Sequence, residues 1–165
     1  MQKQKRVADV VDEIVAAWKR ERPDLELSAV GVMARLGRVS LEFAAAQDEV
    51  LARFGLENGG FDVLATLRRA GSPYVLTPSQ LSERVLLSRS GMTSRLDRLE
   101  SAGLVERTLD PENRRSFRVK LTASGLTTAD EAMTAHTANI TKLLSTLSRT
   151  DLKTFDGLLR KLTRE

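Results

Sequence analysis

Small polar and basic side chains recur at helical spacing between residues 89 and 98. On a helical wheel the apolar residues of this stretch share one face: Met92, Leu96 and Leu99. The opposite face is small and polar: Ser90, Thr93, Ser94 and Asp97. Such groups near a helix N-terminus can read the major groove of DNA, and arginines beside them can contact phosphates. We therefore expect Ser90, Thr93 and Ser94 to face DNA bases and Arg89 and Arg98 to contact the DNA backbone.

Two further arginines, Arg114 and Arg115, lie between two stretches with strand patterns. Residues 104–109 are predicted to form one strand, 110–113 have turn chemistry, and 117–121 alternate apolar and basic side chains as a half-buried return strand does. The two arginines would then stand at the tip of an exposed hairpin. We expect them to reach a phosphate or the minor groove, whose negative potential attracts arginine where it is narrow.

Local signals upstream and downstream position these side chains. Thr77 can cap a helix start, Pro78 suits the first helical position, and Gln80 can reach back to the cap. Gly103 ends the polar helix, because a left-handed residue after a helix costs least as glycine. Residues 77–122 thus give a short helix, a turn, a longer helix and two strands. This order is that of a winged helix-turn-helix and predicts DNA binding.

Amphipathic helices are predicted on both sides of this central unit: residues 5–20, 27–54, 61–71 and two runs after residue 122. Their apolar surface exceeds what one small winged helix can cover, so we expect a homodimer with a shared helical core. A twofold dimer would present two reading helices about one DNA turn apart and would read an inverted repeat.

The expected fold class is mainly α with a small two-stranded β wing. Three parts are expected: N-terminal helices of the dimerisation region over residues 1–55, a winged helix-turn-helix over 56–122, and C-terminal dimerisation helices over 123–165.

Composition excludes several classes of function. With 26 basic and 22 acidic residues the net charge is +4, which favours a polyanionic partner. The absence of cysteine excludes thiol chemistry, and the single histidine, His136, cannot build a zinc site alone. No apolar run approaches ~20 residues and no secretory signal is present, so we expect a cytoplasmic protein without membrane contact. Catalytic and cofactor motifs are missing, so we expect neither an enzyme nor a cofactor.

The chain resembles the MarR family of transcription regulators over nearly its whole length. The resemblance depends on the amphipathic termini, on SRSGMTSRLDRLESAGLVER at 88–107 and on RRSFRVKLT at 114–122. The wing of this family commonly has Asp-x-Arg before the return strand, where this chain has Asn113, Arg114 and Arg115. The resemblance implies a winged helix-turn-helix homodimer that binds double-stranded DNA, and it places Arg115 at the minor groove.

A narrower resemblance is to the urate-responsive branch of that family, which carries an extra N-terminal helix. The branch is marked by a Trp in that helix, an Asp early in the helix before the helix-turn-helix, and an Arg in the recognition helix. Trp18, Asp62 and Arg95 match these positions. The resemblance implies a repressor released by a small anionic ligand, urate-like or a polycarboxylate. Arg95 offers a planar fork for such an anion and Trp18 a face for stacking.

Each of these three residues also has a purely structural interpretation. Trp18 lies on the apolar stripe of its helix and could be a core residue, and Asp62 could stabilise a helix N-terminus. Arg95, on the border of the apolar face, is expected to be half-buried and could contact phosphate instead. The alternative functions are a DNA-binding winged helix without a ligand and a protein-interaction module.

Overall fold

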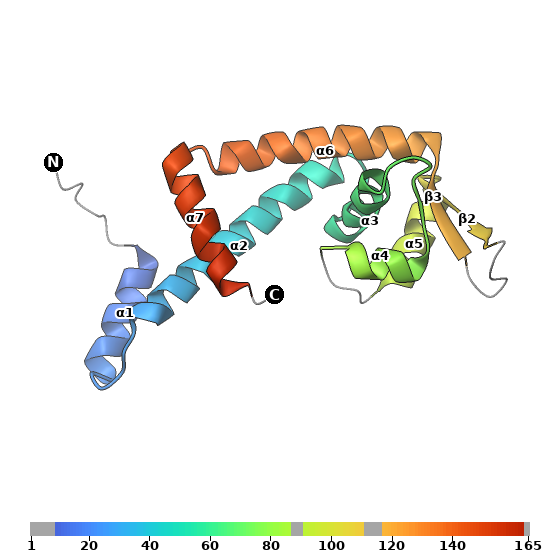
Figure 1. Cartoon of the computed structure of the whole chain (residues 1–165). Coiled ribbons are helices and arrows are strands. Elements are labelled where there is room, and N and C mark those ends of the chain that lie inside the picture. Colours follow the sequence, from blue (N-terminus) through green and yellow to red (C-terminus); the bar gives the residue numbers. More distant parts are fainter. Residues whose placement is uncertain (1–8, 87–90, 111–116, 164–165) are drawn as a thin grey trace. The chain divides into compact units, whose positions relative to one another are not determined.

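The computed structural model of the chain describes residues 9–86, 91–110 and 117–163. The described residues form these helices: α1 (Val10–Glu21), α2 (Ser28–Ala52), α3 (Asn58–Arg69), α4 (Pro78–Arg84), α5 (Met92–Ser101), α6 (Ala123–Leu143) and α7 (Arg149–Leu162). They also form three strands: β1 (Val75–Leu76), β2 (Val105–Leu109) and β3 (Phe117–Leu121). Figure 1 labels these helices and the strands β2 and β3, with colours that follow the chain. The mainly α fold with a β wing is confirmed, and so are the helices predicted on both sides of the central unit.

Two compact units divide the chain, an N-terminal unit of residues 1–45 and a C-terminal unit of residues 46–165. The boundary falls within α2, so this helix belongs partly to each unit.

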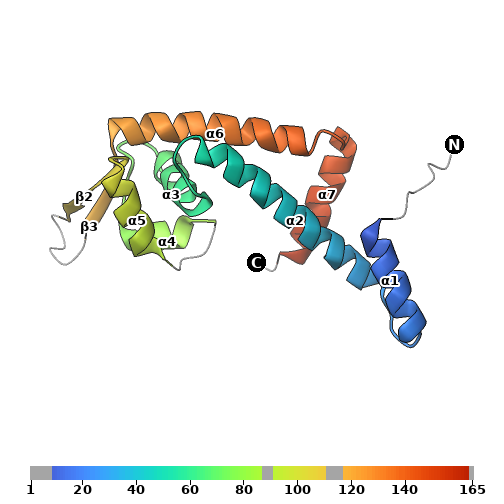
Figure 2. The same cartoon turned by 180° about the vertical axis from the view of Figure 1, so that it is seen from behind.

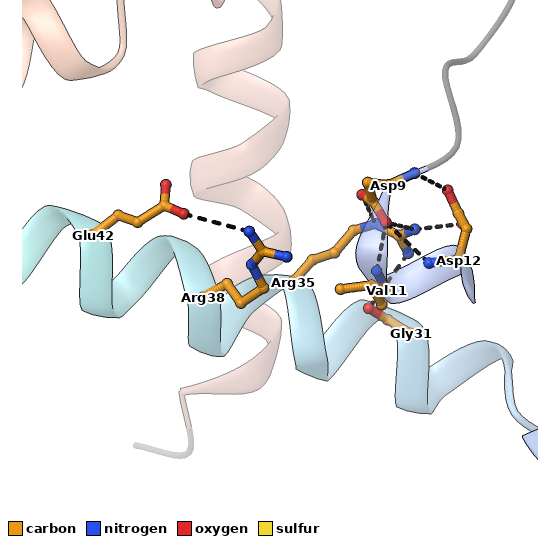
Figure 3. Close-up of polar contacts among 7 residues, drawn as sticks. All are labelled: Asp9, Val11, Asp12, Gly31, Arg35, Arg38 and Glu42. Atoms are coloured by element: carbon orange, nitrogen blue, oxygen red, sulfur yellow. Dashed lines mark hydrogen bonds and ion pairs between the residues drawn. The ribbon is translucent and has the colours of Figure 1, made fainter. Parts of the chain in front are cut away.

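In the N-terminal unit, Arg35 of α2 binds the two carboxylates at the start of α1 (Figure 3). Asp9 caps α1 by accepting hydrogen bonds from the backbone N–H groups of Val11 and Asp12, and Asp12 accepts one from Asp9 in return. The Arg35 guanidinium donates from Nε and Nη2 to both Asp9 oxygens at 3.0 Å and from Nη2 to Asp12 Oδ1 at 2.5 Å. Val11 is buried beside this cluster. A single arginine therefore joins two helices through the cap of one of them.

The core of the C-terminal unit is aliphatic and gathers α3, α4, α5 and the sheet. Figure 2 shows these helices beside the strands, with α6 running along α3. The largest fully buried side chains here are Leu51, Leu64, Leu67, Leu81, Val63 and Val119. Gly125, in the first turn of α6, lies so close to Leu104 that an added Cβ would collide with the Leu104 carbonyl oxygen. The first turn of α6 is therefore seated directly on the segment entering β2.

The sheet has three antiparallel strands in the order β1-β3-β2. The β2–β3 pair, in register from Val105 with Leu121 to Leu109 with Phe117, is the predicted hairpin. The sheet also has a third strand that the sequence did not predict, because β1 pairs with β3 through Val75 and Leu76. A strand of two residues is too short to show an alternating pattern, so the sequence gives no periodic signal for it.

The local signals at the ends of α4 and α5 are confirmed. Thr77 and Gln80 form the reciprocal capping box of α4, with Pro78 at its first position. Gly103 follows α5 with a φ of +69°, the left-handed conformation expected after a helix. Gly91 precedes α5 at +76°, so the helix begins at Met92.

Candidate nucleic-acid interface and effector pocket

The two faces of α5 are as predicted. The apolar residues Met92, Leu96 and Leu99 are buried in the core. The polar residues Thr93, Ser94, Asp97 and Arg98 are exposed. Arg95 is half-buried between the two faces. The packing of three apolar side chains thus fixes which side of α5 is offered to a partner.

Four of the residues predicted to contact DNA lie outside the described residues: Arg89, Ser90, Arg114 and Arg115. Their roles stay predictions from the sequence. The described strands β2 and β3 do show that the segment carrying Arg114 and Arg115 connects two paired strands.

Arg107 of β2 joins the wing to α5, which the sequence did not reveal. Its Nε donates to Glu100 Oε2 at 2.8 Å, its Nη2 to Asp97 Oδ1 at 2.7 Å, and its backbone N–H to Glu100 Oε1 at 3.2 Å. The hydrogen bond from Arg107 holds the pKa of Glu100 below its ordinary value. Asp97 and Glu100 are three residues apart on α5, so their spacing places both on one side of the helix. That Arg107 is the residue that binds both carboxylates follows from the packing of β2 against α5.

Arg98 pairs with Glu57, the residue that precedes α3. Arg98 Nη2 lies 2.7 Å from Glu57 Oε1, and Nη1 donates to Glu57 Oε2 at 3.1 Å. Arg98 Nε also donates to the Ser94 carbonyl oxygen at 3.3 Å. A residue predicted to contact phosphate is therefore paired with the carboxylate of the residue that precedes α3.

Arg95 crosses the first turn of α3. A methyl group at Gly59 would collide with Arg95 Nε, so the side chain lies directly over this glycine. Asp62 stands three residues further along α3, on the same side of the helix, and is only 6% exposed. Arg95 therefore lies across the turn of α3 that leads to Asp62.

Arg95 and Arg98 line a pocket of about 400 Å³ with an apolar floor. Its other walls come from the end of α2, the start of α3 and the end of α5: Ala52, Gly55, Leu56, Glu57, Gly60, Leu99, Ala102 and Leu104. A more open hollow of about 740 Å³ shares Leu56, Glu57 and the two arginines, and adds Asn58 and Ser94. An arginine such as Arg95 in a lining that also holds aliphatic side chains can bind an anion that has an apolar body.

Trp18 belongs to the N-terminal unit, where its side chain is 53% exposed. With Ile14, Ala17 and Glu21 it lines a shallow apolar hollow of about 250 Å³ on α1. Trp18 is therefore not a core residue of its own unit. That Trp18, Asp62 and Arg95 share one ligand site stays a prediction.

His136 of α6 packs against Phe61 of α3, with ring centroids 4.8 Å apart. Its Nδ1 is buried, without a hydrogen-bond partner among the described residues. Burial lowers the pKa of His136. The described residues hold no group of three His, Asp or Glu side chains placed to bind a metal ion. None of the helices in these residues has the length and apolar character to traverse a lipid bilayer.

Comparison with known proteins agrees with this architecture. The MarR family model matches residues 54–116. The regulator PecS of Dickeya dadantii is 38% identical over 154 residues, which is 93% of each chain. Among solved structures, a cysteine-to-serine variant of Escherichia coli MarR complexed with operator DNA is 24% identical with a TM-score of 0.70, covering 95% of this chain and 100% of that one.

A second solved structure has the same fold at lower identity. The organohalide-sensing regulator RdhR in its 2,4-dichlorophenol-bound form is 18% identical with a TM-score of 0.75, covering 98% of this chain and 88% of that one. The winged helix-turn-helix, the extended match to PecS and the MarR family model agree with one another. The chain belongs to the MarR family, whose members are transcriptional regulators and not enzymes.

Proposed function

We propose that the chain is a homodimeric repressor that binds an inverted-repeat operator and is released by a small anionic ligand, urate-like or a polycarboxylate. As a regulator of genes it would act in the cytoplasm. The observation that carries the proposal is the position of Arg95: it is part of α5, whose polar face is exposed, and it lines a pocket next to that face. An anion bound by Arg95 would act directly on the helix that reads DNA.

DNA binding is supported by the exposed face of α5. Thr93 and Ser94 are the described candidates for contacts with base edges and Arg98 for a phosphate, together with Arg89, Ser90, Arg114 and Arg115 from the sequence. The solved MarR chain of the same fold is complexed with operator DNA.

A homodimer is supported by apolar surface that the chain leaves exposed. The outward face of α7 carries Phe155, Leu158 and Leu162, and no residue of α7 is buried in the described structure. α2 exposes Val30, Val32, Met33 and Leu41. Large apolar side chains left exposed on a helix favour an interface with another chain. We propose that the helices of residues 1–55 and 123–165 form the dimer and that residues 56–122 bind DNA.

A ligand is supported by the chemistry of the pocket. Arg95 offers a fork for carboxylate or urate-like oxygens, and the aliphatic side chains in the lining suit a compact organic body. The RdhR chain shows that this fold can hold a small molecule. A coupling of about 1–3 kcal/mol between the two sites would weaken DNA binding roughly 5- to 150-fold. The alternative is a DNA-binding regulator without a ligand.

The test is a gel shift with the DNA immediately upstream of the gene, with and without urate, citrate and aconitate. We expect a shifted band that each effective anion abolishes, while Trp18 fluorescence reports binding. If the band forms and no anion changes either signal, the alternative without a ligand is correct.

Trp18→Phe separates the pocket from the DNA surface. We expect it to keep DNA affinity within several-fold and to reduce the ligand response, because the indole N–H and part of the stacking face are lost. An unchanged response would remove Trp18 from the ligand site.

A further inference from the structure

The ion pair between Glu57 and Arg98 occupies one edge of the arginine fork. Nη1 and Nη2 of Arg98 both point to the Glu57 carboxylate, and Nε points to the Ser94 carbonyl oxygen. A phosphate requires the same kind of paired N–H groups for a two-point contact. Because Glu57 already holds the Nη1–Nη2 edge, Arg98 must leave the carboxylate to grip a phosphate through that edge.

Separating Arg98 from Glu57 costs little free energy, because both side chains are largely exposed to solvent. The Arg98 side chain is 60% exposed and that of Glu57 53%. Exposed ion pairs stabilise a fold weakly and are screened by salt. A DNA backbone with its dense negative charge can therefore draw Arg98 away at small cost.

Glu57 does not cap α3 with its side chain. It is the residue preceding the helix, yet its side chain makes no capping hydrogen bond to the backbone N–H groups. Its carboxylate also lies at the positive end of the α3 dipole, which stabilises it after Arg98 has left. Among hydrogen bonds and ion pairs, the contact that the structure describes for this side chain is the one with Arg98.

From these contacts we propose that Glu57 is an intramolecular competitor of the DNA backbone for Arg98 and thereby sets the affinity of the reading helix. This inference depends on the proposed DNA binding. In the free protein Arg98 rests on Glu57, and on DNA it moves to a phosphate. Glu57 lowers the affinity for any DNA sequence by the cost of that exchange, since a phosphate contact carries no base information.

The decisive variant is Glu57→Gln, measured by fluorescence anisotropy on a labelled random-sequence duplex at low salt. We expect DNA binding about two- to fivefold tighter than for the natural protein, since an exposed pair contributes in that range. The gain should shrink as salt is raised, because screening weakens the competing pair.

Two comparisons make the test specific. Glu49→Gln removes the same charge from an exposed glutamate of α2 for which the structure describes no ion pair, and it should gain less than Glu57→Gln. In an Arg98→Gln background, Glu57→Gln should give no gain, because the arginine for which Glu57 competes is absent. Glu57→Ser, which keeps a good helix-capping residue, serves if the glutamine variant unfolds.

The outcomes separate the inference from the function. Equal affinity of the natural protein and Glu57→Gln would overturn the inference while DNA binding stands. A gain that persists in the Arg98→Gln background would overturn it as well, because Glu57 would then act by repelling DNA directly. Absence of DNA binding by the natural protein would instead overturn the proposed function.

Discussion

Arg95 of α5 lies over Gly59 of α3 so closely that any side chain at position 59 would meet its Nε. The glycine leaves room for a guanidinium between the recognition helix and the helix that carries Asp62. The position of Arg95 therefore depends on the absence of a side chain on a different helix.

Gly59→Ala should displace Arg95 without unfolding the protein. Alanine favours a helix more than glycine does, and the colliding atoms belong to a flexible side chain. We expect the ligand concentration that releases DNA to rise about tenfold or more. Such a rise corresponds to the loss of one charge-assisted contact that contributes about 1.4 kcal/mol or more to ligand binding. Gel shifts with a ligand titration measure it.

Gly37→Ala is the matched control, since position 37 of α2 has open space around an added Cβ. It should leave the ligand response unchanged and raise stability by roughly 0.5–1 kcal/mol. A Gly59→Ala protein with a normal ligand response would show that Arg95 is not a ligand residue.

Arg35→Gln should loosen α1 in the N-terminal unit. Hydrogen bonds from Arg35 lower the pKa of Asp9 to about 2, so this carboxylate is charged throughout the physiological range. The stability it contributes is present above its ordinary pKa and is lost only as the pH falls toward 2. We expect faster amide hydrogen exchange in α1 at neutral pH, since the variant removes the arginine that holds its cap.

The control for that variant is Arg38→Gln. Arg38 pairs only with Glu42 on the same helix, at 3.8 Å, among the described residues (Figure 3). Exchange in α1 should then stay as in the natural protein. Equal rates in the two variants would mean that Arg35 does not anchor α1.

Because of His136, we expect the folded protein to lose stability on mild acidification. Burial lowers its pKa in the folded state, so the unfolded chain binds the proton more readily. The free energy of unfolding should therefore fall as the pH drops below about 6.5, the ordinary histidine value, and recover above it. Urea unfolding between pH 5 and 8 measures this slope. In His136→Gln the part of the slope due to this residue should disappear, and an identical slope would contradict the assignment.

Leu158→Asp should convert the proposed dimer into a monomer. The leucine is 53% exposed on α7, and a charge there would be desolvated in an interface. Light scattering should show a halved mass. Operator binding should weaken about 100-fold or more, because the two α5 helices of the dimer would no longer be linked and could not bind one operator together. Lys153→Asp, on another side of α7, should remain dimeric. A natural protein that is monomeric at micromolar concentration would contradict the proposal itself.

The helices, the capping box of α4 and the two faces of α5 were predictable from the amino-acid sequence. The capping box of Thr77 and Gln80, the stop at Gly103 and the burial of Met92, Leu96 and Leu99 all depend on residues within one or two helical turns of each other. Local hydrogen bonds and the periodicity of apolar residues decide such features, so they can be predicted from the sequence.

The long-range partners of the charged residues, in contrast, were not predictable from the sequence. Glu57 and Arg98 are 41 positions apart. Arg107 reaches α5 from β2, and β1 becomes a strand only because β3 lies beside it. A guanidinium can pair with any carboxylate that the packing of the core brings near, so its partner is set by the arrangement of helices and strands and not by neighbouring residues.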